Sequence, residues 1–253
     1  MLDTAQNVVI FIVCVAASLL FVTLLNRTWP AEMRHAHNEL IGWQLGILGT
    51  TYAVILGFML YTVWTNYGAA ELNADLEANA LRNVFRLAEG LPAQQRVQLE
   101  AECRTYADAV INHDWPEMAN RQIPEESHNI NKDMWRTLMS VKTATASESL
   151  AEDHALSELA SLTEHRRTRL LQSTYQLPTV LWFVLIVGGI LTVGSACMFG
   201  SGSVVLHAFQ VFAFCTLITL ALLAVADINR PFMGSVHVSD YAFQRARQNM
   251  SEE

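Results

Sequence analysis

Long uncharged runs alternate with charged stretches along this chain, and the runs predict where it crosses a membrane. The clearest lies between Glu39 and Glu71, where 31 consecutive residues carry no charge. As a helix rising about 1.5 Å per residue, this run would be about 46 Å long, whereas a bilayer core needs only about 30 Å. It therefore predicts a helix that crosses a membrane and projects beyond it.

Two further uncharged runs predict three more spans. One covers residues 4–26, and the other covers 57 residues at 170–226. The second run contains a glycine- and serine-rich turn at 200–203, which predicts a hairpin with spans near 179–199 and 204–226. The fold class is therefore an all-α membrane protein with four transmembrane helices. We expect the first span to be retained, because no basic region precedes it as in a signal peptide.

The stretch between the second and third spans has the composition of a soluble helical domain. Residues 67–176 hold 17 Asp and Glu against 11 Lys and Arg, a net −6 of the chain's −8. The second span should continue into this domain and end at the Gly-Leu-Pro of 90–92. Further helices are expected at about 93–113 and 131–142, and from about 150 straight into the third span.

Finer features of this domain are also predicted. Trp115-Pro116 should interrupt a helix, because proline disfavours a helical conformation in the residue before it, and the adjacent His113-Asp114 should lie at the surface. The apolar positions of the first helix with helical spacing are Leu72, Leu76, Ala80, Val84 and Leu87.

Arginines beside the spans predict the orientation. Seven lie on the side of the soluble domain and the C-terminal tail, whereas only Arg27 and Arg34 lie on the other. Because basic residues favour the cytoplasm, both termini and the domain are predicted to be cytoplasmic. The predicted parts are 1–66 with two spans, 67–176 as the cytoplasmic domain, 177–227 with two spans, and 228–253 as the tail.

Small residues mark one side of the second span. They are spaced by three or four residues, so they share a helical face that can pack closely on another helix. These residues are Gly42, Gly46, Gly49, Ala53 and Gly57.

Polar residues at the span ends allow several interpretations. Asn38 could cap the second span with Glu39 at its positive end, or His37, Asn38 and Glu39 could form a pore mouth. A metal site that includes His35 is a weaker alternative. At the end of the last span, Asp227 and Arg230 can pair before Pro231 stops the helix. The aromatic residues around the second span are typical of membrane interfaces: Trp43, Tyr61, Trp64 and Tyr67.

Known catalytic and cofactor motifs are missing from the sequence. It contains no phosphate-binding loop, CxxC, HExxH or nucleophile elbow. We therefore expect no enzyme activity, cofactor or metal, and the acidic balance argues against nucleic-acid binding.

Two short motifs resemble a known family. The first runs from His37-Asn38-Glu39 through Gly42 and the YAVILGF of 52–58 to Trp64 and Tyr67. It is similar to the second transmembrane helix of bestrophins, and closer to a bacterial bestrophin-like family, DUF4239. The second is Pro231-Phe232-Met233-Gly234, followed by Val238-Ser239.

The resemblance implies a homo-oligomer, most simply a pentamer, around a central axis in a bacterial inner membrane. Its second helices would line a hydrophobic neck for inorganic ions, at Thr50, Val54 and Phe58. The calcium-binding acidic run of bestrophins is missing after Gly234, so calcium gating is not expected. The acidic domain and Glu39 favour cations weakly.

Two hypotheses follow. The first is an oligomeric ion channel with this hydrophobic neck. The second is a membrane-bound sensor or scaffold without a conducting path, in which helix shifts transmit a signal.

Overall fold

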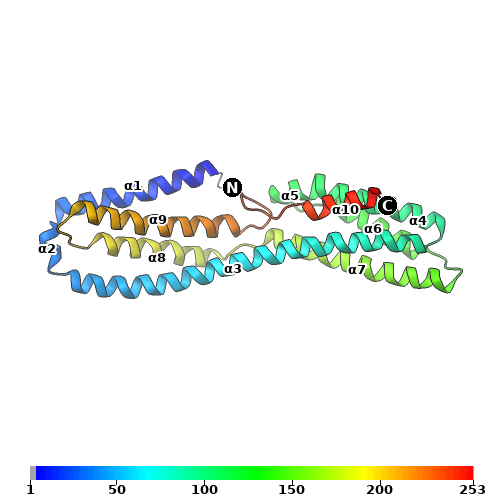
Figure 1. The fold of residues 1–253 in the computed structure, drawn as a ribbon, viewed down its shortest axis with the longest axis horizontal. Coiled ribbons are helices and arrows are strands. Elements are labelled where there is room, and N and C mark those ends of the chain that lie inside the picture. Colours follow the sequence, from blue (N-terminus) through cyan, green and yellow to red (C-terminus); the bar gives the residue numbers. More distant parts are fainter. Residues whose placement is uncertain (1–3, 253) are drawn as a thin grey trace. The chain divides into compact units, whose positions relative to one another are not determined.

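The structure is a computed structural model that describes residues 4–252, and every regular element within them is helical. The helices are shown in Figure 1: α1 (Thr4–Thr28), α2 (Ala31–His35), α3 (Asn38–Leu87), α4 (Ala93–Ala109), α5 (Trp115–Ala119), α6 (Glu126–Met139), α7 (Ala146–Thr174), α8 (Thr179–Cys197), α9 (Val204–Ile228) and α10 (Tyr241–Glu252).

The chain forms two compact units. The first combines residues 1–65 with 176–229, and the second combines residues 66–175 with 230–253. Helix α3 contributes its first part to one unit and its second part to the other. Each unit is described by itself below.

The first unit consists of membrane-length helices. Four segments are long and apolar enough to cross a membrane: Ala5–Thr28, Asn38–Gly90, Thr179–Cys197 and Val204–Ile228. Within residues 4–252, the prediction of an all-α membrane protein with four such helices is confirmed. Helix α1 packs along α9, and α9 packs along α8, as Figure 1 shows.

Little of the apolar surface in the first unit is buried. One cluster joins Val63 of α3 to Leu177, Leu185 and Val225, and a smaller one contains Val22, Cys197 and Val211. The other faces of these helices expose apolar side chains, as is suitable for contact with lipid or with another helix in a membrane.

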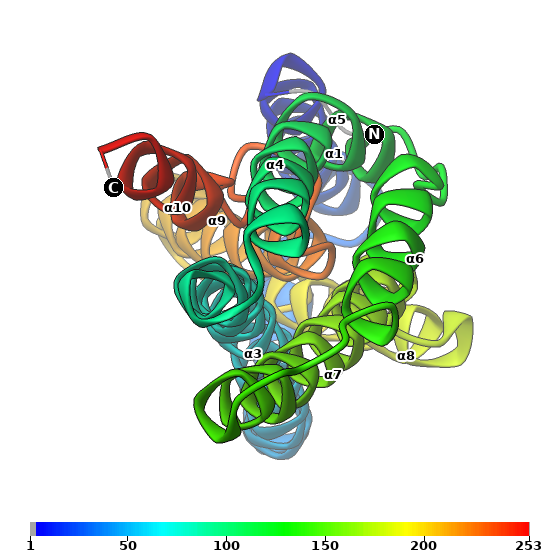
Figure 2. The same ribbon diagram turned by 90° about the vertical axis from the view of Figure 1, so that its right-hand side faces the viewer.

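The second unit has a larger core. In Figure 2, α3, α4, α6 and α7 surround its centre, and α10 lies beside α4. Side chains such as Leu99, Tyr106, Leu138, Leu159 and Phe243 are completely buried there.

Two predictions around Trp115 in the second unit were wrong. Trp115-Pro116 does not interrupt the chain's helical path, because a π-helical turn at Val110–Asp114 connects α4 directly to α5. Pro116 lies in the first turn of α5, directly after the π-helical turn. Asp114 is fully buried instead of lying at the surface.

The helix predicted to run from about 150 into the third span is two helices. Helix α7 ends at Thr174 and α8 begins at Thr179, after the extended residue Tyr175 and Pro178. Proline disfavours a helical residue before it, which explains the break.

The predicted apolar stripe of α3 in this unit was also partly wrong, because Leu72 and Leu76 are exposed. The predicted positions Ala80 and Val84 are buried, and the other buried apolar positions of this part of α3 include Ala70, Ala74, Ala78 and Leu81.

Candidate functional site

The first part of α3 buries a narrow stripe. Ile41, Tyr52 and Val63 are its buried apolar residues, separated by eleven residues each. Eleven residues is close to three turns of about 3.6 residues, so these side chains lie on one line. The other side chains in this part of α3 are exposed or only partly buried, so most of the helix surface is available to lipid or to other chains.

The three predicted neck residues lie on the opposite side of α3. At about 100° per residue, Thr50, Val54 and Phe58 are about 160°, 200° and 240° around the helix from Tyr52. Val54 is 53% exposed and Phe58 is 64% exposed. The Thr50 hydroxyl donates a hydrogen bond to the Gly46 carbonyl at 2.8 Å, so it is satisfied within its own helix. This side of α3 therefore offers mainly apolar groups.

The small-residue face lies between the buried stripe and the predicted neck residues. A Cβ atom added at Gly46, Gly49 or Gly57 would meet nothing within 4 Å, whereas one at Gly42 would touch the Phe199 ring at 3.4 Å. Ala53 is exposed as well. Within one copy of the chain, only Gly42 of these residues therefore has a neighbouring side chain packed closely against it.

Tyr52 attaches α3 to α8. Its ring lies against two consecutive glycines, so that a Cβ atom at Gly188 would be 2.6 Å from Tyr52 Cδ2, and one at Gly189 would be 3.1 Å from Tyr52 Oη. The tyrosine of the YAVILGF motif thus has a packing role that needs glycine on the neighbouring helix.

Asn38 has a different role from the predicted helix cap. Its side-chain amide donates to the Gly200 carbonyl at 2.7 Å and accepts from the Gly200 N–H at 2.8 Å. Gly200 is itself tightly enclosed, because a Cβ atom there would be 2.4 Å from the His35 backbone nitrogen. Asn38 therefore joins the start of α3 to the turn between α8 and α9. His37 and Glu39, the other predicted mouth residues, are exposed.

Arg34 is a polar anchor at the same end of this unit that sequence reasoning missed. Its side chain is fully buried, donates to the Cys197 carbonyl at 3.0 Å, and bonds the side-chain oxygen of Asn26. In the sequence it counted only as an outer basic residue. The arrangement ties α2 to the ends of α1 and α8.

The second sequence motif folds into a turn within the second unit. Gly234 has a φ of 95°, a conformation that favours glycine. Phe232 packs edge-on against Trp115 with ring centroids 5.6 Å apart, and the Trp115 indole N–H donates to the Val238 carbonyl at 3.0 Å. Pro231 is buried in the same turn. These contacts give the residues of this motif a role in packing the turn.

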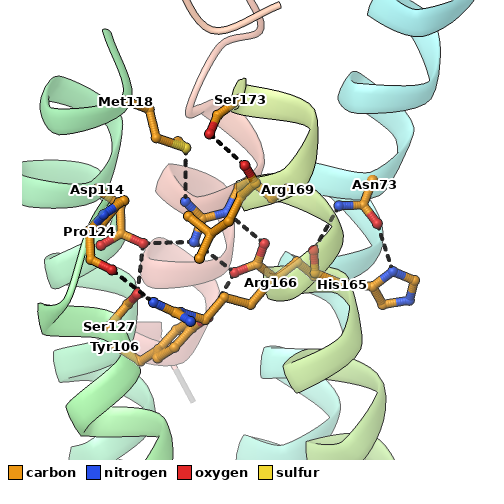
Figure 3. Close-up of polar contacts among 12 residues, drawn as sticks. Asn73, Tyr106, Asp114, Met118, Pro124, Ser127, His165, Arg166, Arg169 and Ser173 are labelled. Carbon is orange, nitrogen blue, oxygen red and sulfur yellow. Dashed lines mark hydrogen bonds and ion pairs between the residues drawn. The ribbon is translucent and has the colours of Figure 1, made fainter. Parts of the chain in front are cut away.

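A buried charged network lies beside this turn, and Figure 3 shows it. Arg169 of α7 donates to both carboxylate oxygens of Glu77, at 2.7 and 3.0 Å, and to Asp114 Oδ2 at 2.7 Å. All three side chains are fully buried. The Arg169 guanidinium also lies over the Trp115 ring, 5.1 Å from its centroid. One arginine thus connects α3, the π-helical turn and α7.

Neighbouring side chains complete the network. The Tyr106 hydroxyl donates to Glu77 at 2.7 Å, the Ser127 hydroxyl donates to Asp114 at 2.7 Å, and Arg166 donates to Ser127 at 2.8 Å. Burial alone would lower the pKa of Arg169, but the two carboxylates raise it above its usual range. Burial and the Glu77 carboxylate raise the pKa of Tyr106, which keeps its hydroxyl protonated as a donor.

The charged network was not found from the sequence, although one signal was present. Glu77 lies beside Ala78 on the buried line of α3 that runs from Ala70 to Val84. A charge within such a stripe needs a buried partner. Within residues 4–252, neither the His35, His37 and Glu39 of the metal alternative nor any other set brings three metal-ligating side chains together.

With this geometry described, comparison with known proteins identifies the family. The sequence model of the Bestrophin-like domain matches residues 12–243. The chain belongs to the bestrophin-like family. No curated protein matches it significantly.

Solved structures show the same fold. A point mutant of a bacterial bestrophin homologue from Klebsiella pneumoniae has a TM-score of 0.74 at 14% identity, covering 95% of this chain and 99% of that chain. A second mutant of this homologue has a TM-score of 0.71 at 16% identity, covering 96% and 99%. A further structure of it, phased with zinc, has a TM-score of 0.70 at 14% identity, covering 95% and 97%. This bestrophin-like chain is therefore a membrane protein with the fold of those homologues.

Proposed function

We propose that this bestrophin-like chain forms a homo-oligomeric ion channel, with a pentamer as the expected assembly. Copies of α3 surround a central axis, and Thr50, Val54 and Phe58 form a hydrophobic neck. The small-residue face beside these residues packs against the neighbouring copy. An apolar constriction of this kind can control conduction by excluding water.

The observation that supports this proposal most is the exposed apolar line on α3, opposite the stripe that holds the helix to its own chain. Phe58 and Val54 are more than half exposed there. Next to them, glycines leave room for a close helix that one chain does not supply. An apolar line flanked by a face for close packing is what a helix needs to line a narrow axis within a ring of copies.

Charge supports a preference for cations. The chain carries a net charge of −8, and Glu39 is exposed at the predicted outer end of α3. Negative charge near a pore raises the local concentration of cations. We place both termini in the cytoplasm, as the positions of the arginines indicate, and the protein in a bacterial inner membrane, as the family resemblance implies.

The test is conductance of the purified protein in planar bilayers with different salt concentrations on the two sides. Phe58→Ala and Val54→Ala should each raise the unitary conductance by about twofold or more, because a wider and less apolar neck is easier to wet. The reversal potential assigns the ion class. Matched controls are Phe183→Ala and Val180→Ala on α8, whose side chains are 66% and 65% exposed.

Equal currents in the neck variants and in the unmodified protein would contradict the assignment of Val54 and Phe58 to a neck. A silent bilayer with the double variant Val54→Ala and Phe58→Ala, in a protein that still assembles, would instead favour the sensor or scaffold hypothesis.

A further inference from the structure

A small hollow lies at the start of α3. It has a volume of about 380 Å³ and is lined by Ala36, His37, Glu39, Leu40 and Trp43. Glu39 and Trp43 are one helical turn apart, so both side chains point to the same side of α3.

The groups of this hollow are suited to a positive charge. Glu39 has an exposed carboxylate without an ion pair or hydrogen bond to any side chain in the part of the chain that the structure describes. Trp43 is 70% exposed, so its indole face can be reached. A carboxylate attracts cations by charge, and an indole face attracts them through its quadrupole.

Nearby basic groups do not neutralise the hollow. Arg34 is fully buried and directs its guanidinium to Cys197 and Asn26. The His37 ring lies beside Trp29, with their centroids 6.0 Å apart. The free charge at the hollow is therefore that of Glu39.

The chemistry favours organic cations over metal ions. One carboxylate is too few ligands for a divalent metal ion, and the described residues contain no group of three metal-ligating side chains. Aromatic faces suit quaternary ammonium groups, which carry their charge on an apolar surface.

The direction of Trp43 links the hollow to the predicted neck. At about 100° per residue, Trp43 is about 180° around α3 from Tyr52, in line with Val54. In the proposed oligomer, Trp43 side chains from several copies would face one axis, about two turns outside Thr50. This part of the argument rests on the proposed function.

We propose that the hollow binds quaternary ammonium ions, with Glu39 supplying the charge and Trp43 the aromatic face. In the proposed oligomer, such an ion at the outer end of α3 blocks conduction.

Calorimetric titration of the purified full-length protein in detergent with tetramethylammonium chloride tests this binding, with sodium chloride as the reference titrant. Trp43→Leu should weaken binding about tenfold, whereas Trp43→Tyr should keep most of it. Glu39→Gln should also weaken binding, by about threefold to tenfold. The matched control is Phe209→Leu, because Phe209 is the sixth residue of α9, as Trp43 is of α3, and is 64% exposed.

The outcomes separate this inference from the proposed function. Loss of binding in Trp43→Leu but not in Phe209→Leu supports the site even if no current is seen. An absence of tetramethylammonium binding, or equal binding in Trp43→Leu and the unmodified protein, overturns it even if the protein conducts. Where currents are present, tetramethylammonium on the side of Glu39 should block them, and the absence of block would exclude the site from the pore.

Discussion

The two units of this protein differ in which side chains they bury: the second buries charged side chains, whereas the first leaves large apolar side chains exposed. In the second unit, Arg169, Glu77 and Asp114 are completely buried in a shared network. In the first unit, Phe58 and Trp43 of α3 are more than 60% exposed. The second unit completes its packing with its own side chains, whereas the first leaves apolar surface for lipid or for further copies of the chain.

The first unit has polar contacts at one end of its helices, whereas the second unit has them in its core. The first unit uses Arg34 and Asn38 at one end of its helices, where they bond the backbone of Cys197 and Gly200. Further along α3, Tyr52 is held by close packing on Gly188 and Gly189. Stability in the first unit should therefore depend on a few close approaches, and in the second on a buried charged centre.

The largest expected effect is removal of the buried arginine. Arg169→Ala leaves Glu77 and Asp114 buried without their partner, which should cost about 3–5 kcal/mol of stability. The control is Arg167→Ala, because Arg167 has a 74% exposed side chain and a 3.8 Å ion pair with Glu164. Thermal unfolding of the purified protein in detergent, followed by circular dichroism, measures the difference. Equal unfolding temperatures for the two variants would show that the charged network does not stabilise the second unit.

A smaller loss is expected from a methyl group at the turn of the first unit. In Gly200→Ala, the new Cβ atom would lie 2.4 Å from the His35 nitrogen and 2.5 Å from the Ala31 carbonyl oxygen. These are backbone atoms, so α2 must shift, at a cost of about 3 kcal/mol. Gly202→Ala, where nothing lies within 4 Å of the added atom, should be close to neutral. The same unfolding measurement applies, and a neutral Gly200→Ala would mean that this end of the unit is loosely packed.

The smallest expected effect tests a local contact of α7. The Thr145 hydroxyl accepts from the Glu148 N–H at 3.1 Å, and Glu148 Oε2 accepts from the Thr145 N–H at 3.3 Å. Thr145→Ala removes this capping box and should cost about 1 kcal/mol. Thr143→Ala, in the same exposed loop, is the control. If both variants unfold at the same temperature as the unmodified protein, the start of α7 does not limit the stability of the second unit.

Local sequence patterns were sufficient for the membrane helices. The 31 uncharged residues after Glu39 correspond to the first part of α3, and the glycine- and serine-rich turn separates α8 from α9. These features depend on hydrophobicity and backbone preference, which neighbouring residues determine together. The motif around 52–58 and the one at 231–234 also indicated the family that the comparison identified.

Patterns in the sequence were therefore sufficient to predict the all-helical class, the four membrane-length segments and the family. The burial of Asp114, the bonds of Asn38 with Gly200 and the close packing of Tyr52 on Gly188 could be seen only once the chain was folded. Each of these depends on two segments far apart in the chain, and periodicity within one segment carries no information about its partner. The burial of Arg169 is the clearest case, because a charge on a helix has a favourable place in a core only when distant carboxylates are brought to it.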